Sequence, residues 1–200
     1  ITNTQFLANF TNAGIYDGTM KNDLETVGNA QISTAVVKYG SGSMYFPATN
    51  GNYFVGPPAQ PNLAFGTGAF TVEMWVYPTA FTNAAAGLVG VGVSGSGSTS
   101  WNIEVSTAGA VLYRDAGLDR FTSSSNLSLN TWTHIAVART STAVTMYFNG
   151  VSVGTYTTIN NITYNSTHSL YVGTGIQATG SRQYIGYIDD LRITSSYARY

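Results

Sequence analysis

Apolar and polar residues alternate through the clearest patterned stretch of the chain, residues 70–77, which read Phe-Thr-Val-Glu-Met-Trp-Val-Tyr. A period of two predicts a β-strand with one face in the core and the other outside. One side would carry Phe70, Val72, Met74 and Val76, and the other Thr71, Glu73, Trp75 and Tyr77. We expect the strand to end at Pro78, because proline lacks the N–H that a sheet ladder needs.

Similar short segments, separated by turn residues, recur along the chain. Strands are expected at residues 5–10, 43–46, 101–105, 111–113, 133–139, 144–148, 151–155, 169–172 and 184–194. Asn149-Gly150 is the strongest hairpin signal, since both residue types tolerate a positive φ. No helical period is sustained, and the Ser/Gly-rich stretch 94–100 is interpreted as a surface loop between strands. The pattern predicts an all-β sandwich or barrel that forms a single domain over residues 1–200.

Charge is scarce in this sequence. Only 8 Lys and Arg and 9 Asp and Glu occur in 200 residues, so 8% are charged, against about 25% in an average soluble domain. A nucleic-acid binder with a basic face is therefore excluded. The absence of Cys excludes a disulfide scaffold and a Cys-based metal or redox site. An uncharged polar surface rich in aromatic residues suits neutral, hydroxyl-rich ligands or a packed protein assembly.

Three segments together resemble a known family. They are residues 70–78, residues 132–139 with 146–150, and residues 186–193 with 198–200. Their order and spacing resemble the laminin-G-like, concanavalin-A-like jelly roll over about residues 5–200, nearly the whole chain. Residues 9–15, 28–34 and 39–46 also resemble variants of that domain found in bacteriophage virion and tail-associated proteins.

The resemblance implies a two-sheet antiparallel jelly-roll sandwich, concanavalin-A-like, with one sheet concave. It also implies binding, most often to glycans or cell-surface proteins, and a structural Ca²⁺ near the chain termini. Carried over residue by residue, the ion would be held by Asp17, Asn22 and Asp189, since Ca²⁺ prefers oxygen ligands. In the alternative interpretation, Asp17 caps a turn and Asp189 pairs with Arg192.

A glycan site is sought where aromatic rings occur beside planar polar groups, because sugars present both C–H faces and hydroxyls. The densest such stretch lies in a predicted loop, preceded by Trp101 at the end of the Ser/Gly-rich segment. The candidate ligand-binding residues are Trp101, Tyr113, Arg114, Asp115, Asp119 and Arg120. The alternative is an ordinary salt-bridged surface hairpin with Trp101 at the edge of the core. Arg182 and Gln183 belong to a second candidate loop.

Enzyme chemistry finds little support in the sequence. A glycosidase needs two carboxylates about 5–9.5 Å apart, whereas Glu73 is the only acid on its predicted strand and the other acids lie on separate segments. No Gly-x-Ser-x-Gly elbow supports a serine nucleophile. We therefore expect no enzymatic activity.

The expected function is a non-enzymatic carbohydrate-binding or adhesion module of a virion or cell-surface protein that recognises surface glycans. The alternative is a structural decoration or assembly protein of a viral capsid, tail or filament. Expected partners are surface glycans or neighbouring virion or surface proteins, within a homo-oligomer or larger assembly. We expect no nucleic acid and no membrane insertion, and a location that is extracellular or on a virion surface. A polysaccharide depolymerase is disfavoured by the dispersed acids.

Overall fold

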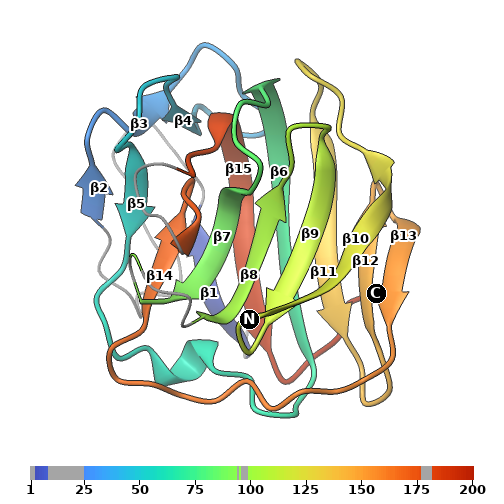
Figure 1. The fold of residues 1–200 in the computed structure, drawn as a ribbon. Helices are drawn as coiled ribbons and strands as arrows, with labels where there is room; N and C mark the ends of the chain where they lie inside the picture. The colour runs from blue at the N-terminus through green and yellow to red at the C-terminus, as the bar shows by residue number, and fades with distance from the viewer. Residues whose placement is uncertain (1–2, 9–24, 94, 96–98, 177–181) are drawn as a thin grey trace.

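Two antiparallel β-sheets pack face to face in the computed structural model (Figure 1). The structure describes residues 3–8, 25–93, 95, 99–176 and 182–200. The eight-stranded sheet has the order β13-β12-β11-β6-β15-β4-β3, and β1 pairs with β15 off this path. In chain order its strands are β1 (Thr4–Ala8), β3 (Gln31–Ser33), β4 (Ser43–Phe46), β6 (Phe70–Ala80), β11 (Thr133–Arg139), β12 (Val144–Phe148), β13 (Val151–Tyr156) and β15 (Ile185–Ser195).

The seven-stranded sheet has the order β10-β9-β8-β7-β14-β5-β2, and part of it lies toward the viewer in Figure 1. Its strands are β2 (Glu25–Val27), β5 (Tyr53–Val55), β7 (Ala86–Gly92), β8 (Thr99–Val105), β9 (Ala110–Asp115), β10 (Leu118–Asn126) and β14 (Ser169–Val172). A short 3₁₀ helix, η1 (Pro61–Leu63), lies in the connection between β5 and β6. The expectation of an all-β, two-sheet jelly-roll sandwich is confirmed.

The core lies between the sheets and is built from alternate residues of their strands. On β6 the four side chains predicted to face inward, Phe70, Val72, Met74 and Val76, are all fully buried. The facing sheet contributes Trp101 and Ile103 from β8, which are also fully buried. The period of two in the sequence thus identified which face of β6 packs in the core, and it left Glu73, Trp75 and Tyr77 on the outer face.

The prediction that Pro78 ends its strand is wrong. β6 continues to Ala80, and Pro78 lies opposite Gly186 of β15. On its other side β6 pairs with β11 only as far as Thr133, opposite Val76, so no β11 residue needs an N–H from Pro78. Gly186 makes room for the pairing, because a Cβ there would lie 2.2 Å from the Tyr77 carbonyl oxygen.

The stretch predicted as a loop around residues 113–121 is instead a hairpin of β9 and β10. Its turn is Ala116-Gly117, and both residues have positive φ, 48° and 76°. Alanine seldom adopts this conformation, so the sequence carried a weaker turn signal than Asn149-Gly150. The latter pair does form the β12–β13 turn, with Asn149 at φ 48° and Gly150 at φ 83°.

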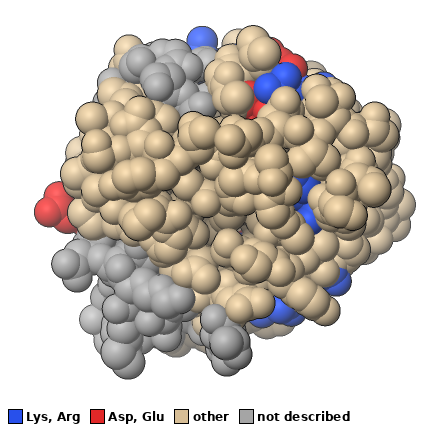
Figure 2. Space-filling model, turned by 90° about the horizontal axis from the view of Figure 1, so that it is seen from below, with Lys and Arg blue, Asp and Glu red and all other residues tan. Residues whose placement is uncertain are grey.

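Charged residues are sparse on the surface as well as in the composition. Figure 2 shows one end of the molecule with long stretches free of Lys, Arg, Asp and Glu. Among the described residues, no helix has the length and apolar character needed to cross a bilayer.

Candidate functional site

Aromatic side chains gather on the outer face of the eight-stranded sheet, which we call the aromatic face. They form two rows that run across the strands rather than along them. The first row is Tyr39, Trp75, His134, Tyr200 and Tyr147, with adjacent ring centroids 5.3–6.0 Å apart. The second row is Tyr45, Tyr187, Tyr77 and Trp132, with adjacent centroids 4.8–5.9 Å apart.

Strand register builds these rows. Trp75 of β6 pairs directly with His134 of β11, and Tyr77 of β6 pairs with Tyr187 of β15, which in turn pairs with Tyr45 of β4. Residues directly opposite in a sheet have their side chains on the same face, so aromatic residues at matched positions must adjoin. Because Trp75 and Tyr77 are two residues apart on one strand, the two rows lie side by side.

A pocket of about 430 Å³ opens on the first row. Its walls include the aromatic rings of Tyr39, Trp75, His134 and Tyr200, and its polar lining is Glu73, Asn149, Asp190, Arg192 and Arg199. Pockets that combine a hydrophobic wall with a few convergent polar groups are the usual form of a small-ligand site. This pocket therefore has the composition of a binding site.

Glu73 forms the base of the pocket, and its side chain is only 3% exposed. Oε1 lies 3.1 Å from Nε of Arg192 and 2.8 Å from Nε of Arg199, contacts that are ion pairs without hydrogen-bond alignment. Oε2 accepts a hydrogen bond from the Tyr200 hydroxyl at 2.7 Å and lies 3.5 Å from Nε2 of His134. The carboxylate is thus surrounded by four groups from three separate segments.

The pKa of Glu73 lies below its ordinary value. Burial is the largest single influence and would raise it, because desolvation disfavours the charged form. The hydrogen bonds from His134 and Tyr200 and the positive charges of Arg192 and Arg199 together outweigh burial. Glu73 is therefore ionised at neutral pH. Burial, followed by the same hydrogen bond to Glu73, raises the pKa of Tyr200 to about 12.

Residues 196–200 lie across the outer face and complete the pocket. Thr71 of β6 secures this segment, since its hydroxyl donates to the Tyr197 carbonyl at 3.1 Å and accepts from the Arg199 N–H at 3.0 Å. These bonds place Arg199 and Tyr200 beside Glu73, two residues further along the same strand. The local sequence supports this placement, because Thr71 and Glu73 share the outer face of β6.

A β-bulge at Asp190 brings the polar residues of β15 to the same face. Asp189 lies opposite Trp75 and Arg192 lies opposite Glu73, so three steps on β15 match two on β6. In a regular strand, positions three apart point to opposite faces, so the bulge is what keeps Asp189 and Arg192 on one face. Asp190 adopts φ 47°, a conformation that Asp tolerates better than most residues.

The family model described as the concanavalin A-like lectin/glucanases superfamily matches residues 49–198. The chain belongs to this superfamily. No curated protein sequence shows significant similarity to it.

Solved structures similar to this superfamily member include two kinds of binding domain. The binding domain of Paraclostridial Mosquitocidal Protein 1 superposes with a TM-score of 0.76 at 17% identity, covering 100% of this chain and 50% of that one. Domain 4 of AbnA, an extracellular arabinanase from Geobacillus stearothermophilus, solved in complex with arabinotriose, gives 0.72 at 16% identity, covering 98% and 94%. The binding domain of Botulinum neurotoxin DC, solved in complex with rat synaptotagmin II, gives 0.69 at 10% identity, covering 98% and 49%. The chain thus spans about half the length of the toxin domains.

The residues predicted from the sequence to bind a ligand do not form one surface. Trp101, Tyr113 and Asp115 are at most 1% exposed and point into the core of the sandwich. Trp101 donates from Nε1 to the Leu63 carbonyl at 2.9 Å. Their burial follows from alternation on β8 and β9. The alternative interpretation of a salt-bridged hairpin with Trp101 at the edge of the core is closer to the structure, which places Trp101 within the core.

Arg120 joins these buried residues at the edge of the core. Its Nε donates to Oδ1 of Asp115 at 2.5 Å, and Oδ2 of Asp115 accepts from the Tyr113 hydroxyl at 3.2 Å. Burial, followed by the charge and hydrogen bond of Asp115, raises the pKa of Tyr113 well above its ordinary value. These three residues therefore serve as a buried polar network within the hairpin.

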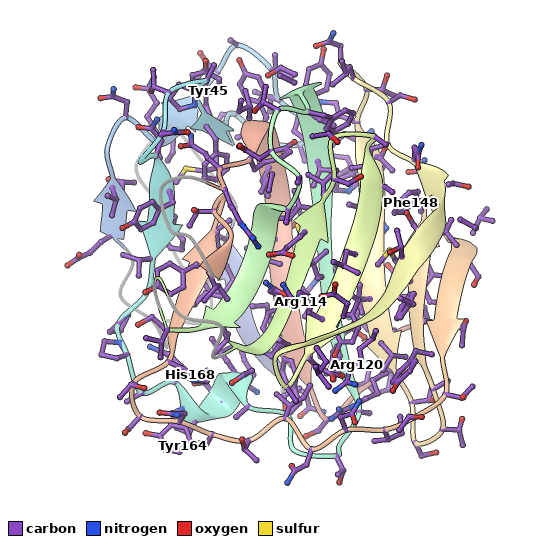
Figure 3. All side chains as sticks on the ribbon, viewed as in Figure 1. Tyr45, Arg114, Arg120, Phe148, Tyr164 and His168 are labelled. Atoms are coloured by element: carbon purple, nitrogen blue, oxygen red, sulfur yellow. The ribbon has the colours of Figure 1, made fainter. Side chains whose placement is uncertain are left out.

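Arg114 and Asp119 lie on the outer face of the seven-stranded sheet. Nε of Arg114 is 2.7 Å from Oδ1 of Asp119, and its Nη1 is 3.7 Å from Oε2 of Glu104. Figure 3 shows Arg114 on that sheet and Arg120 nearer its lower edge. Glu104 is fully buried there and takes a hydrogen bond from Asn102 at 3.0 Å. Burial raises the pKa of Glu104 more than the nearby Arg114 and Arg182 lower it.

The predicted calcium ligands are only partly covered by the structure, because Asp17 and Asn22 lie outside the described residues. Asp189 is 2% exposed, and its Oδ2 accepts the N–H groups of Lys38 and Tyr39, both at 3.0 Å. Oδ1 accepts the Asp190 N–H at 2.8 Å. The described residues contain no cluster of three or more His, Asp or Glu suited to a metal. Arg192, the alternative partner of Asp189, pairs with Glu73 instead. The calcium site stays a prediction.

The aromatic face was not proposed as a site from the sequence, although part of its signal was present. Alternation placed Trp75 and Tyr77 on the face of β6 opposite the core residues. Their convergence with Tyr200 and Arg199 depends on strand register and on the course of residues 196–200. Those pairings join segments more than 50 residues apart and are not visible in a local pattern.

Proposed function

We propose that the chain is a non-enzymatic carbohydrate-binding module and that the aromatic face is its binding surface. In its full form the proposal makes it an adhesion module of a virion or cell-surface protein that recognises surface glycans. The observation that carries the proposal is the pair of aromatic rows beside a pocket with charged and amide side chains. Aromatic rings pack against the C–H faces of sugars, and planar polar groups bind their hydroxyls.

Known structures support the proposal by analogy of fold. An arabinanase domain of this fold was solved with arabinotriose, and botulinum neurotoxin type C, another protein of similar structure, depends on interaction with two ganglioside molecules for cell entry. Identities of 16% and 11% to these chains mean that the likeness is one of fold. The aromatic rows and the pocket residues of this chain are therefore the evidence for a binding surface.

The state of Glu73 argues against hydrolysis. A glycosidase needs a carboxylic acid with a raised pKa to protonate the leaving oxygen, and a second carboxylate as nucleophile or base. The pKa of Glu73 is lowered, and its oxygens are already engaged by Arg192, Arg199 and Tyr200. A carboxylate held in this way is a poor proton donor and a poor nucleophile.

Binding is best tested with variants that remove rings from the aromatic face. Trp75→Ala and Tyr77→Ala should each abolish or strongly weaken retention on a panel of immobilised polysaccharides. Tyr164→Ala is the matched control, because Tyr164 is 50% exposed and lies at the lower end of the molecule in Figure 3, in the connection between β13 and β14. Weak single sites gain from avidity, so the protein should be displayed as a multimer.

The outcomes of this assay separate the possibilities. Loss of binding in the two β6 variants, with retention in the Tyr164 variant, supports the proposal. Absence of binding to every polysaccharide by the wild-type multimer, with and without Ca²⁺, overturns it. Release of reducing ends from a polysaccharide would show that the protein is a depolymerase. Including Ca²⁺ also tests the proposed structural ion of Asp17, Asn22 and Asp189. If the ion binds there, the protein should have a higher melting temperature in Ca²⁺ than in EDTA.

A second candidate is a structural role in a capsid, tail or filament. It is favoured by the low charge of the surface, since few charges need to be desolvated when such a face is covered. A stable assembly would bury more than about 1,000 Å². Light scattering that shows an oligomer, together with loss of that oligomer in Trp75→Ala, would favour assembly over glycan binding by the same face.

A further inference from the structure

The arginines of the Glu73 pocket present donor groups that no described residue occupies. Arg192 and Arg199 both contact Oε1 of Glu73 through Nε. Among the described residues, no acceptor takes a hydrogen bond from their terminal Nη groups. The two side chains are 25% and 37% exposed, so their outer ends reach solvent. Contact with Glu73 thus fixes two guanidinium groups beside the pocket and leaves the paired Nη groups of each, here called its fork, available to a ligand.

Basic residues are concentrated at this pocket, although the whole chain has a net charge of −1. Arg192 and Arg199 face the negative charges of Glu73 and Asp190 in the lining. Lys38 adds a third cation, since its Nζ lies 4.0 Å from the ring centroid of Trp75. Three of the eight basic residues of the chain therefore lie at this one site, beside the acids Glu73 and Asp190 and the buried Asp189, which accepts the Lys38 N–H.

Lys38 also affects what can pack on Trp75. Its ammonium is held over the ring by a cation–π contact and lies 5.4 Å from the Tyr39 ring centroid. A neutral sugar that packed on this face of Trp75 would have to displace the ammonium. A sugar that carries a carboxylate could instead pair with it while the ring and the pyranose remain in contact.

We propose that the Glu73 pocket binds the carboxylate of an acidic sugar, a uronic acid or a sialic acid. This inference rests on the proposed carbohydrate-binding function and adds the ligand class. The guanidinium forks of Arg192 and Arg199 match the two oxygens of a carboxylate, which Arg recognises in a bidentate manner. The aromatic wall of Trp75 and Tyr39 contacts the sugar ring, and Lys38 closes the site with a third positive charge.

The experiment compares each acidic sugar with its own methyl ester, which removes the charge and leaves the ring unchanged. Galacturonate oligosaccharides and sialyllactose are the two probes, measured by isothermal titration against wild-type protein at low salt. We expect at least one acid to bind about tenfold more tightly than its ester, the equivalent of about 1.4 kcal/mol. The probe that shows this preference identifies whether the ligand is a uronic or a sialic acid.

Three variants locate the preference for the acid. Lys38→Gln leaves every contact of Glu73 in place, and Arg199→Gln removes one fork. Each should reduce the ratio of acid to ester affinity, whereas Arg199→Lys should keep part of the charge effect and lose the bidentate contact. Near-ultraviolet circular dichroism and melting temperature confirm that each variant is folded. An acid preference that persists unchanged in both Gln variants would place the carboxylate elsewhere and overturn the inference.

The possible failures are distinguishable. Equal affinity for acid and ester, with binding lost in Trp75→Ala, would overturn the acidic-sugar inference and leave the carbohydrate-binding function standing. Absence of binding to either acid, with binding to neutral glycans, would also overturn the acidic-sugar inference and leave the carbohydrate-binding function standing. Absence of binding to any glycan would overturn both.

Discussion

Replacing Glu73 by Gln tests whether its buried carboxylate holds the outer face together. The substitution keeps the size of the side chain and an oxygen that can still accept from the Tyr200 hydroxyl. It removes the negative charge that lies 2.8 Å from Arg199 and 3.1 Å from Arg192. The two guanidinium groups would then face each other with no carboxylate between them. We therefore expect the variant to fold with reduced stability.

The magnitude follows from burial and exposure of the partners. Breaking a fully buried ion pair costs about 3–5 kcal/mol. Here the carboxylate is 3% exposed but Arg192 and Arg199 are 25% and 37% exposed. Water can therefore solvate the two guanidinium groups in the variant and offset part of the lost interaction energy. A cost of about 2–3 kcal/mol at neutral pH is expected. For a domain of this size that corresponds to a fall in melting temperature of about 4–12 °C.

The pH dependence gives a second, signed expectation. Because the pKa of Glu73 is lowered on folding from an ordinary 4.5, its contribution is complete above 4.5 and is lost as pH falls through the lower, folded value. The stability gap between wild type and Glu73→Gln should therefore narrow in acid. Urea denaturation at neutral pH and in steps down to about pH 3 measures it.

Glu104→Gln is the matched control on the other sheet. Its pKa is raised on folding, mainly by burial, so the ionised form is disfavoured and loss of the charge should cost less than about 1 kcal/mol or stabilise the protein. Relative to wild type, this variant should gain stability as pH rises above 4.5. A loss below about 1 kcal/mol for Glu73→Gln at neutral pH, or a gap that stays constant in acid, would refute the account of Glu73.

Three further substitutions test other parts of the structure by urea denaturation. Arg139→Met should lower the free energy of unfolding by about 3–5 kcal/mol, because this fully buried guanidinium donates to several loop carbonyls, including that of Gly68 at 2.7 Å from Nε. An unchanged free energy of unfolding would contradict that role. Gly173→Ala should lower the free energy of unfolding by more than about 2 kcal/mol, since Gly173 has φ +82° and a Cβ there would lie 2.0 Å from the Phe46 ring. An unchanged free energy of unfolding would show that Phe46 can move. Trp101→Phe should lower the free energy of unfolding by about 1–3 kcal/mol through loss of its hydrogen bond to the Leu63 carbonyl. Its glycan affinity should be unchanged, and a reduced affinity in the folded variant would show that Trp101 contributes to binding.

The sequence predicted the architecture well because alternation and turn chemistry are local. Strands such as β6, β11 and β12 alternate cleanly, and Asn149-Gly150 marks the hairpin between β12 and β13. Strand β7 was missed because it reads Ala-Gly-Leu-Val-Gly-Val-Gly and is buried on both faces, so no polar residue marks its alternation. Strands β2, β3 and β5 were missed because three residues are too few to show a period.

The site was harder to predict for a physical reason. Glycan recognition was sought where polar and aromatic residues adjoin in sequence, as they do from Tyr113 to Arg120. In a strand such neighbours point to opposite faces, so a dense stretch is divided between core and surface. The pocket instead draws on β6, β11, β15 and the residues after β15, which only the sheet brings together.

The bulge at Asp190 leaves β15 tolerant of a change in chain length at this one position. Deleting that single residue would place Asp189 and Arg192 two positions apart, so both would keep their places opposite β6 on the outer face. Leu191 and Ile193, now fully buried, would stay in the core. The pocket would keep its arginines and lose the carboxylate of Asp190. A one-codon deletion would thus change the charge of the pocket without disturbing the packing beneath it.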